Sequence, residues 1–347
     1  MRLILIFLVP FLVTFCSIPL LRIIAIKLNI LDIPGGRKIH ETPTPLLGGV
    51  AIYFGLLSGL LLTNRFSFYI PLVTSALLIL VIGVIDDIRG LSARIRLFFQ
   101  FIASLMIISS GWSITVFHNK IWGSSINIIV TLIWIIGITN SYNYLDGLDG
   151  LAAGSAVINL FFFGIILFFT NQKELGLLSV ILGFVCMGFL PYNFRKYRKM
   201  FLGDAGSTVL GFCLASIALG GYWAEDSFVK ISIPILILGV PIFDMIFTTV
   251  MRTREGKIKS IPEWLKYAGK DHFHHYLVDL GLGGVGSVIF IYFVSCSLGI
   301  GAILISNGKP IEAILTLIQS GIIFGMIAVL IVAGKRHHNA GHKEEIL

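Results

Sequence analysis

Charged residues are scarce in this sequence. Only 13% of the 347 residues are Asp, Glu, Lys or Arg, whereas soluble globular domains contain roughly 25%. Hydrophobic residues make up 56% of the chain, and its mean hydropathy is +0.93. This composition excludes a water-soluble globule and predicts an integral membrane protein.

Cysteine is also rare. The four cysteines, Cys16, Cys186, Cys213 and Cys296, all lie within apolar runs and lack the spacing of metal ligands. A secreted disulfide scaffold is therefore excluded, and nothing in their pattern indicates redox chemistry. We interpret them as small apolar core residues.

Eleven apolar runs approach the length of about 20 residues that a helix needs to cross a bilayer. Pro10 and Pro19 interrupt the first run and no cleavage pattern follows it, so we predict a span there and not a signal peptide. The predicted fold is all-α, with one polytopic transmembrane domain over residues 1–334 and a polar tail over 335–347. The predicted spans are 3–21, 46–63, 68–85, 97–117, 125–141, 151–169, 175–191, 205–223, 231–250, 285–306 and 311–333.

Basic residues are distributed unequally between the two sides of the predicted membrane domain. Twenty of the 26 Lys and Arg residues fall on one side, and the other side receives Arg2, Arg65, Lys120, Lys173, Lys230 and Lys309. The positive-inside rule makes the richer side cytoplasmic, with the N-terminus outside and the C-terminus inside. This topology accounts for the net charge of +8, and no motif accompanies it that would indicate nucleic-acid binding. The predicted cytoplasmic loops are 22–45, 86–96, 141–150, 191–204 and 251–284.

Aspartates gather at the cytoplasmic ends of the predicted spans. Charged side chains near membrane depth are costly, which makes them candidates for function. An ion-coupled transporter, the alternative function class, tends to carry such groups near the bilayer midplane, where this sequence offers only Asp244. The sequence therefore favours a reactive site at the cytoplasmic rim, made of Asp86, Asp87, Asp146, Asp149 and Asp204.

Asp86 and Asp87 end a span that presents its helix C-terminus to the cytoplasm. The helix dipole disfavours each carboxylate there by about 0.3–1 kcal/mol, so a cation is required nearby. Arg89 or Arg94 is one candidate, and a divalent ion is another, because Mg²⁺ binds to a few carboxylates together with waters and phosphates. Arg96, at the start of the next span, is within reach of the same pair.

Two further motifs carry the remaining aspartates. Asn143, Asp146 and Asp149 lie in NSYNYLDGLDG, whose Asp-Gly steps indicate turns, either as simple helix caps or as a ligand-binding loop. Asp204 lies in GDAGS at the start of a span. It is either an N-cap or a metal ligand beside a phosphate, since helix N-termini bind anions.

A histidine cluster lies in the largest cytoplasmic loop. Asp271 is predicted to cap a helix that ends near Gly281, with His272 and His275 on one face and His274 on another. This arrangement favours hydrogen-bond donors for an anionic substrate over a three-ligand zinc site. Solvated histidines are the alternative.

Three other features bear on ligand binding. Lys38 lies in a basic loop rich in Pro and Gly that suits phosphate or lipid headgroups. Gln100 follows Arg96 by one helical turn. Pro234 and Pro241 predict a bent helix around Asp244.

Six segments together resemble one protein family. RKIHETPTPLLGG, VIDDIRGLSARIRLFFQ, NSYNYLDGLDGLAAG, FLGDAGSTVLG, PIFDMIF and KDHFHHYLVDLGL occur in the order typical of polyprenyl-phosphate N-acetylhexosamine-1-phosphate transferases, glycosyltransferase family 4. The histidines match the bacterial branch that usually transfers N-acetylglucosamine 1-phosphate. The stretch 267–271 departs from the usual pattern, so the resemblance does not determine which amino sugar is transferred.

The resemblance implies a specific reaction. A UDP-amino-sugar donates its sugar 1-phosphate to undecaprenyl phosphate with Mg²⁺, for which Mn²⁺ is a substitute, and UMP is released. It further implies a multi-pass protein of the bacterial cytoplasmic membrane that begins a cell-wall or surface polysaccharide. Membrane lipid is an implied partner, nucleic acid is not, and a homodimer stays open.

The resemblance also assigns residues to this reaction. It makes Asp204 and Asn143 the metal site, and Asp86 a base or, in a rival proposal, a nucleophile. Asp87 and His272 complete the catalytic group. The residues left for binding substrate are Lys38, Arg96, Asp146, Asp149, His274 and His275.

Overall fold

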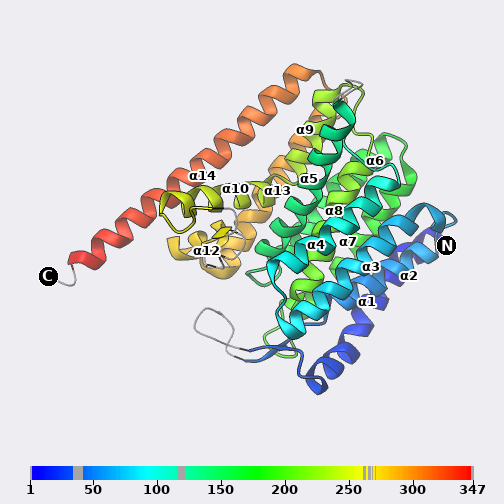
Figure 1. Cartoon of the computed structure of the whole chain (residues 1–347), viewed down its shortest axis with the longest axis horizontal. Coiled ribbons are helices and arrows are strands. Elements are labelled where there is room, and N and C mark those ends of the chain that lie inside the picture. Colours follow the sequence, from blue (N-terminus) through cyan, green and yellow to red (C-terminus); the bar gives the residue numbers. More distant parts are fainter. Residues whose placement is uncertain are drawn as a thin grey trace. The chain divides into compact units, whose positions relative to one another are not determined.

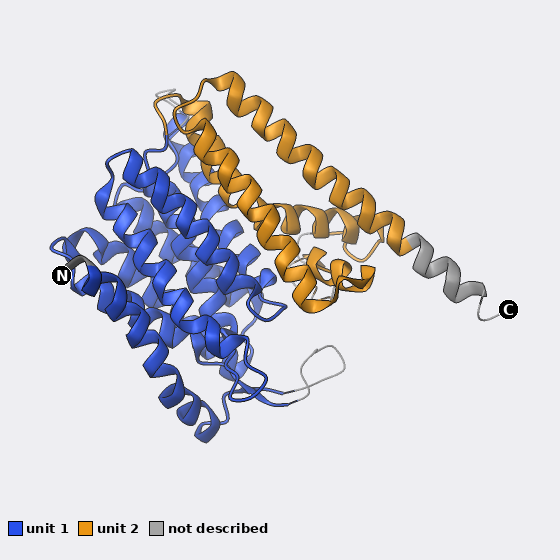
Figure 2. Ribbon diagram, turned by 180° about the vertical axis from the view of Figure 1, so that it is seen from behind, with its two compact units in different colours: residues 1–223 blue, residues 224–347 orange. Residues whose placement is uncertain are grey.

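The computed structural model of the chain is almost entirely helical (Figure 1). It describes residues 2–33, 42–115, 122–260, 263, 264, 267, 269 and 271–344. The described residues form two compact units, 1–223 and 224–347 (Figure 2). Whether residues 1–334 act as one catalytic domain stays a prediction.

The first unit contains eight helices among its described residues and one small antiparallel sheet. In the sheet, Leu31 lies opposite Pro45 and Asp32 opposite Thr44. The elements are α1 (Arg2–Lys27), β1 (Leu31–Asp32), β2 (Thr44–Pro45), α2 (Gly48–Leu61), α3 (Phe66–Arg89), α4 (Ala93–Ser109), α5 (Gly123–Leu145), α6 (Leu151–Phe169), α7 (Lys173–Asn193) and α8 (Gly203–Gly220).

The described part of the second unit is also helical. The elements are α9 (Ser227–Ile237), α10 (Gly239–Arg254), α12 (Phe273–Leu277), the π-helix η1 (Val278–Leu282), α13 (Gly283–Ile305) and α14 (Pro310–Glu344). The predicted polar tail, 335–347, thus continues α14 as far as Glu344.

Each of the eleven predicted spans overlaps a described helix, but the span 231–250 falls on two helices, α9 and α10, and α4 ends at Ser109, well before the predicted end at 117. Eight described helices are long and apolar enough to cross a membrane, or nine if α9 and α10 form one span. The helix α2 has 14 residues, or about 21 Å, which is shorter than the hydrocarbon core of about 30 Å. The helical, polytopic architecture is as predicted, while the count of eleven and the sides of the termini stay predictions.

The bend predicted around Pro234 and Pro241 is present. The helices α9 and α10 meet at an angle of 76°, and Asp244 lies in the first half of α10. A proline lacks an N–H donor and its ring crowds the preceding turn, so a helix with two prolines so close together breaks between them.

Glycines let three helices of the first unit pack backbone against backbone. A Cβ on Gly83 of α3 would lie 2.3 Å from the Ala205 Cα of α8, and one on Gly49 of α2 would lie 2.4 Å from the Gly206 nitrogen. Any larger residue would force these helices apart. The packing places the end of α3 beside the start of α8.

We expect the substitution Gly83→Ala to lower the thermal unfolding midpoint of the purified protein. The added methyl group overpacks the α3–α8 contact, and overpacking costs about 1–3 kcal/mol. Gly183→Ala is the matched control, because its new Cβ would lie an ordinary 3.9 Å from Leu160 and alanine favours the helix. Equal midpoints for the two variants would contradict the close crossing.

Candidate active site

The carboxylate of Asp87 caps the helix that carries Asp204. Asp87 Oδ1 accepts the backbone N–H of Asp204 at 2.8 Å, and Oδ2 accepts that of Ala205 at 3.3 Å. The unpaired N–H groups and the dipole at the start of α8 favour this negative charge, which offsets its unfavourable place at the end of α3. The N-cap interpretation of Asp204 is therefore wrong: Leu202 occupies the N-cap position, and Asp87 supplies the capping oxygens.

Arg96 joins two of the five aspartates. Its Nη1 donates to Asp86 Oδ2 at 3.0 Å and lies 3.5 Å from Asp204 Oδ2. The cation beside the pair is thus Arg96, whereas the sequence pointed first to Arg89 or Arg94. The Asp86 side chain is 5% exposed and that of Asp204 is 42% exposed, so Asp204 is the more open carboxylate of the two.

Asn143 orients the Asp204 side chain. Its Nδ2 donates to Asp204 Oδ1 at 2.8 Å and to Ser207 Oγ at 3.0 Å. Ser207 was missed in the sequence, although its place three residues after Asp204 puts both on one helix face. Gln100, one helical turn after Arg96, bonds to Asn140 of α5: its Oε1 accepts from Asn140 Nδ2 at 2.7 Å.

The loop after α5 carries the next two aspartates. Burial raises the pKa of Asp146 to about 8, and the nearby carboxylates of Asp204 and Asp149 act in the same direction. Asp149 forms an ion pair with Lys199. Asn193 Oδ1 accepts the Gly150 N–H at 2.6 Å, which holds this loop against the end of α7. The sequence brought out neither Lys199 nor Asn193 as a partner of this loop.

The carboxylate cluster has the donor chemistry that Mg²⁺ prefers. Among the described residues, no group of three or more His, Cys, Asp or Glu side chains could hold a metal ion by itself. Mg²⁺ does not require such a cage, because it is often held by one or two carboxylates with waters and substrate phosphates. Asp204, whose side chain is 42% exposed, and the Oδ1 of Asn143 fit that need. Both oxygens of Asp87 instead accept the N–H groups that begin α8.

The three predicted histidines belong to the second unit. His272 Nδ1 lies 2.9 Å from Asp244 Oδ2. The ring of His274 stacks beside that of His272 and lies 4.2 Å from that of His275, centroid to centroid. His274 is fully buried, and its ring nitrogens have no hydrogen-bond partner in the described part of the chain.

The start of the histidine helix differs from the prediction. His272 occupies the N-cap position of α12. The Asp271 carboxylate instead accepts two hydrogen bonds from Arg252, one from Nη2 at 2.6 Å and one from Nε at 3.0 Å. A buried guanidinium competes for this carboxylate more strongly than backbone N–H groups do. The predicted end near Gly281 is confirmed, since Gly281 breaks the helix with a φ of 96°.

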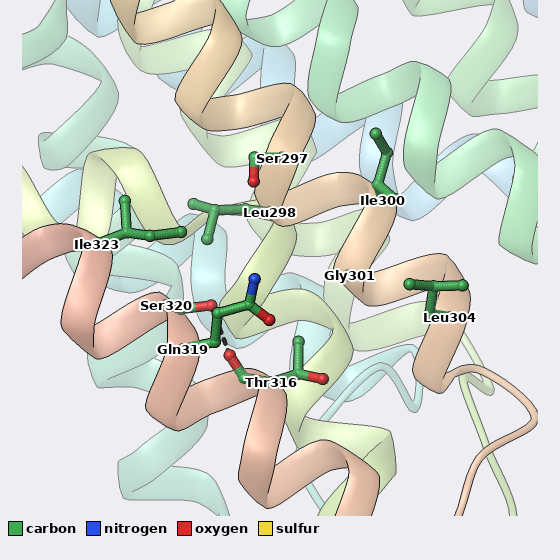
Figure 3. A pocket seen from close by; sticks show the side chains of 9 residues that line it. All are labelled: Ser297, Leu298, Ile300, Gly301, Leu304, Thr316, Gln319, Ser320 and Ile323. Carbon is green, nitrogen blue, oxygen red and sulfur yellow. Dashed lines mark hydrogen bonds between the residues drawn. The ribbon is translucent and has the colours of Figure 1, made fainter.

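Lys38 lies outside the described residues. A pocket of about 150 Å³ between α13 and α14 is lined by Leu298, Leu304 and Ile323 and by the polar Thr316, Gln319 and Ser320 (Figure 3). It has no charged lining residue to bind phosphate.

Comparisons with known proteins agree with the motifs. The sequence model of glycosyl transferase family 4 matches residues 69–222, which include all five aspartates. A probable undecaprenyl-phosphate N-acetylglucosaminyl 1-phosphate transferase of Bacillus subtilis is 34% identical over 88% of this chain and 86% of its own length.

Two more distant relatives carry related names. The decaprenyl-phosphate N-acetylglucosaminephosphotransferase of Mycolicibacterium smegmatis is 31% identical over 81% of this chain and 76% of its own length. The undecaprenyl-phosphate alpha-N-acetylglucosaminyl 1-phosphate transferase of Escherichia coli is 27% identical over 75% and 72%. With its ordered motifs and these relatives, the chain belongs to glycosyl transferase family 4, the polyprenyl-phosphate N-acetylhexosamine-1-phosphate transferases.

Proposed function

We propose that this protein transfers N-acetylglucosamine 1-phosphate from UDP-N-acetylglucosamine to undecaprenyl phosphate and releases UMP. The names of its relatives support the sugar phosphate and the lipid acceptor. The observation that carries the proposal is the bridge from Arg96 to Asp86 and Asp204, which combines a phosphate-binding cation with an open carboxylate. The transporter alternative has no support from these relatives.

Arg96 is the side chain placed to meet an incoming phosphate. The Arg96 side chain is 33% exposed, and its guanidinium has N–H donors beyond the Nη1 group that faces the two aspartates. Both substrates are polyanions that repel each other. Asp204 and Asn143 would hold Mg²⁺, which when bound would supply positive charge to offset this repulsion.

Asp86 assists the lipid phosphate in a direct attack. An oxygen of that phosphate forms a bond to the β-phosphorus of the donor, and the bond from this phosphorus to UMP breaks. Both Asp86 oxygens already accept hydrogen bonds, from Leu91 N–H and from Arg96, which holds the carboxylate in one orientation and makes it a poorer nucleophile. Asp87 keeps Asp204 in place through the cap of α8.

The remaining predicted residues bind the nucleotide-sugar in this proposal. Asp149, paired with Lys199, and Asp146 lie on the loop after α5. The proposal assigns the same substrate to Lys38, His274 and His275, and it gives His272 a catalytic role.

The proposed membrane arrangement has eleven spans, with residue 1 outside and residue 347 in the bacterial cytoplasm. The loops 22–45, 86–96, 141–150, 191–204 and 251–284 then face the cytoplasm, where nucleotide-sugars are made. Labelling of single cysteines at the two ends, in a variant without native cysteines, tests this arrangement. Labelling of both ends from one side would refute it.

The proposed reaction predicts UMP release that depends on both substrates. Purified protein should release UMP from UDP-N-acetylglucosamine only when undecaprenyl phosphate is present, because the lipid phosphate is the attacking group. A panel of other UDP-sugars, assayed by UMP release, then reports sugar specificity. Equal release without lipid would argue for hydrolysis and against transfer.

Metal dependence should centre on Asp204. The substitution Asp204→Asn removes a negative oxygen from the open carboxylate and should raise the Mg²⁺ concentration at half-maximal activity by about tenfold, which is 1.4 kcal/mol. Asp226→Asn is the control, because Asp226 caps α9 and asparagine keeps that cap. An unchanged metal requirement in Asp204→Asn would remove Asp204 from the metal site.

Asp86→Asn should keep measurable activity that recovers partly between about pH 6 and 9. The second pKa of a phosphate monoester is about 6, so the acceptor needs less help from a base as the pH rises. The measurement is a pH profile of turnover with wild type as reference. A flat profile near zero, with a phosphorylated Asp86 trapped when the lipid is left out, would instead establish a two-step mechanism.

A further inference from the structure

A stripe of polar side chains runs along α10 of the second unit. Asp244, Thr248 and Arg252 follow one another at intervals of four residues, so they lie on one helix face. All three are buried, with exposed fractions of 1%, 1% and 2%. Buried polar groups are costly unless they are paired, which directs attention to their partners.

The stripe holds the residues that begin the histidine helix. Asp244 Oδ1 accepts the Phe273 backbone N–H at 2.8 Å, and Thr248 Oγ1 donates to the Asp271 carbonyl at 3.3 Å. Arg252 forms its paired contact with the Asp271 carboxylate. Asp271 and Phe273 are thus fixed to α10, and His272 between them also contacts Asp244 through its ring.

The same contacts determine which ring nitrogen of His272 carries the proton. Arg252 Nη2 lies 3.3 Å from His272 Nε2, and a guanidinium can only donate, so Nε2 is the acceptor. Nδ1 then carries the hydrogen and donates to Asp244 Oδ2 at 2.9 Å. A doubly protonated imidazole would set an Nε2–H against the Arg252 donor.

Charge balance agrees with a neutral His272. Asp244 contacts the ring, and Asp271 pairs with Arg252. Lys257 Nζ lies 3.9 Å from Asp271 Oδ2 and 2.7 Å from Glu255 Oε2, and Glu255 also pairs with Lys335. The three cations already match the three carboxylates. A positive charge on His272 is therefore not needed to stabilise Asp244.

We propose that Asp244 is a positioning residue that acts through His272. It holds the imidazole as the neutral Nδ1–H tautomer, in which the single lone pair of Nε2 accepts from Arg252. The proposal rests on the proposed function, in which His272 acts on the nucleotide-sugar. Because the one ring N–H already donates to Asp244, the ring in this orientation has no N–H left to donate to a phosphate oxygen of that substrate.

Nitrogen NMR of the ¹⁵N-histidine-labelled full-length protein in lipid nanodiscs tests the tautomer directly. The signals of His272 are those that disappear in His272→Asn. We expect one protonated Nδ1 and one unprotonated Nε2 at neutral pH. An imidazolium, or the Nε2–H tautomer, in the wild-type protein would overturn the proposal, whatever the variants do.

Steady-state kinetics test whether Asp244 acts through His272. Asp244→Asn should lower kcat/KM for UDP-N-acetylglucosamine by about tenfold and leave the KM for undecaprenyl phosphate within about twofold. The double variant Asp244→Asn, His272→Asn should have a kcat/KM little lower than that of the worse single variant. Thr253→Val, on the same helix and outside the stripe, is the control. Additive losses, or an equal loss for the lipid substrate, would refute the coupling.

A second comparison keeps the test open if Asp244→Asn fails to fold. The amide nitrogen of asparagine at position 272 takes the place of Nδ1 and can donate to Asp244, whereas glutamine places its amide nearer Nε2. His272→Asn should therefore retain at least about threefold more activity than His272→Gln. The reverse order would refute the proposal. Absence of transferase activity in the wild type would instead refute the proposed function, while the tautomer would still stand.

Discussion

The contact between the Asp87 carboxylate and the first N–H groups of α8 is the constraint on which the first unit's site depends. Backbone crossings at Gly83 and Gly49 bring the start of α8 to the end of α3. The buried N–H groups there need an acceptor, and Asp87 supplies it. Asp204 is thereby released from capping its own helix, and its carboxylate meets Arg96 and Asn143.

Both polar clusters solve the same electrostatic problem in the same way. Carboxylates near membrane depth are costly, and each cluster offsets them with an arginine from a neighbouring segment. Arg96 joins Asp86 to Asp204 and stays a third exposed, so its cluster remains accessible to a ligand. Arg252 is buried with Asp271, so its cluster is closed around His272. One arrangement suits substrate binding, and the other suits the fixed orientation of a side chain.

The proposed chemistry accounts for the location of these charges. An acceptor with an apolar tail keeps that tail in lipid, so its phosphate reacts at the level of the headgroups, beside the helix ends. Asp86, Asp146 and Asp204 all lie at or next to helix termini in the structure. A transferase of this kind needs fixed charges at one rim of the membrane and no continuous polar path across it.

The sequence by itself determined the helical membrane architecture, the break near Pro234 and Pro241, the set of five aspartates and the family. These features follow from composition, local periodicity and short motifs, which act over a few residues. The partners of the charged groups were decided by the tertiary structure. Asp87 caps a helix 117 positions away, Asp86 binds Arg96 among the three arginines that the sequence offered, and Asp271 binds Arg252 instead of capping α12. Such pairs depend on which helices cross and how closely, and side-chain packing between distant segments sets that geometry.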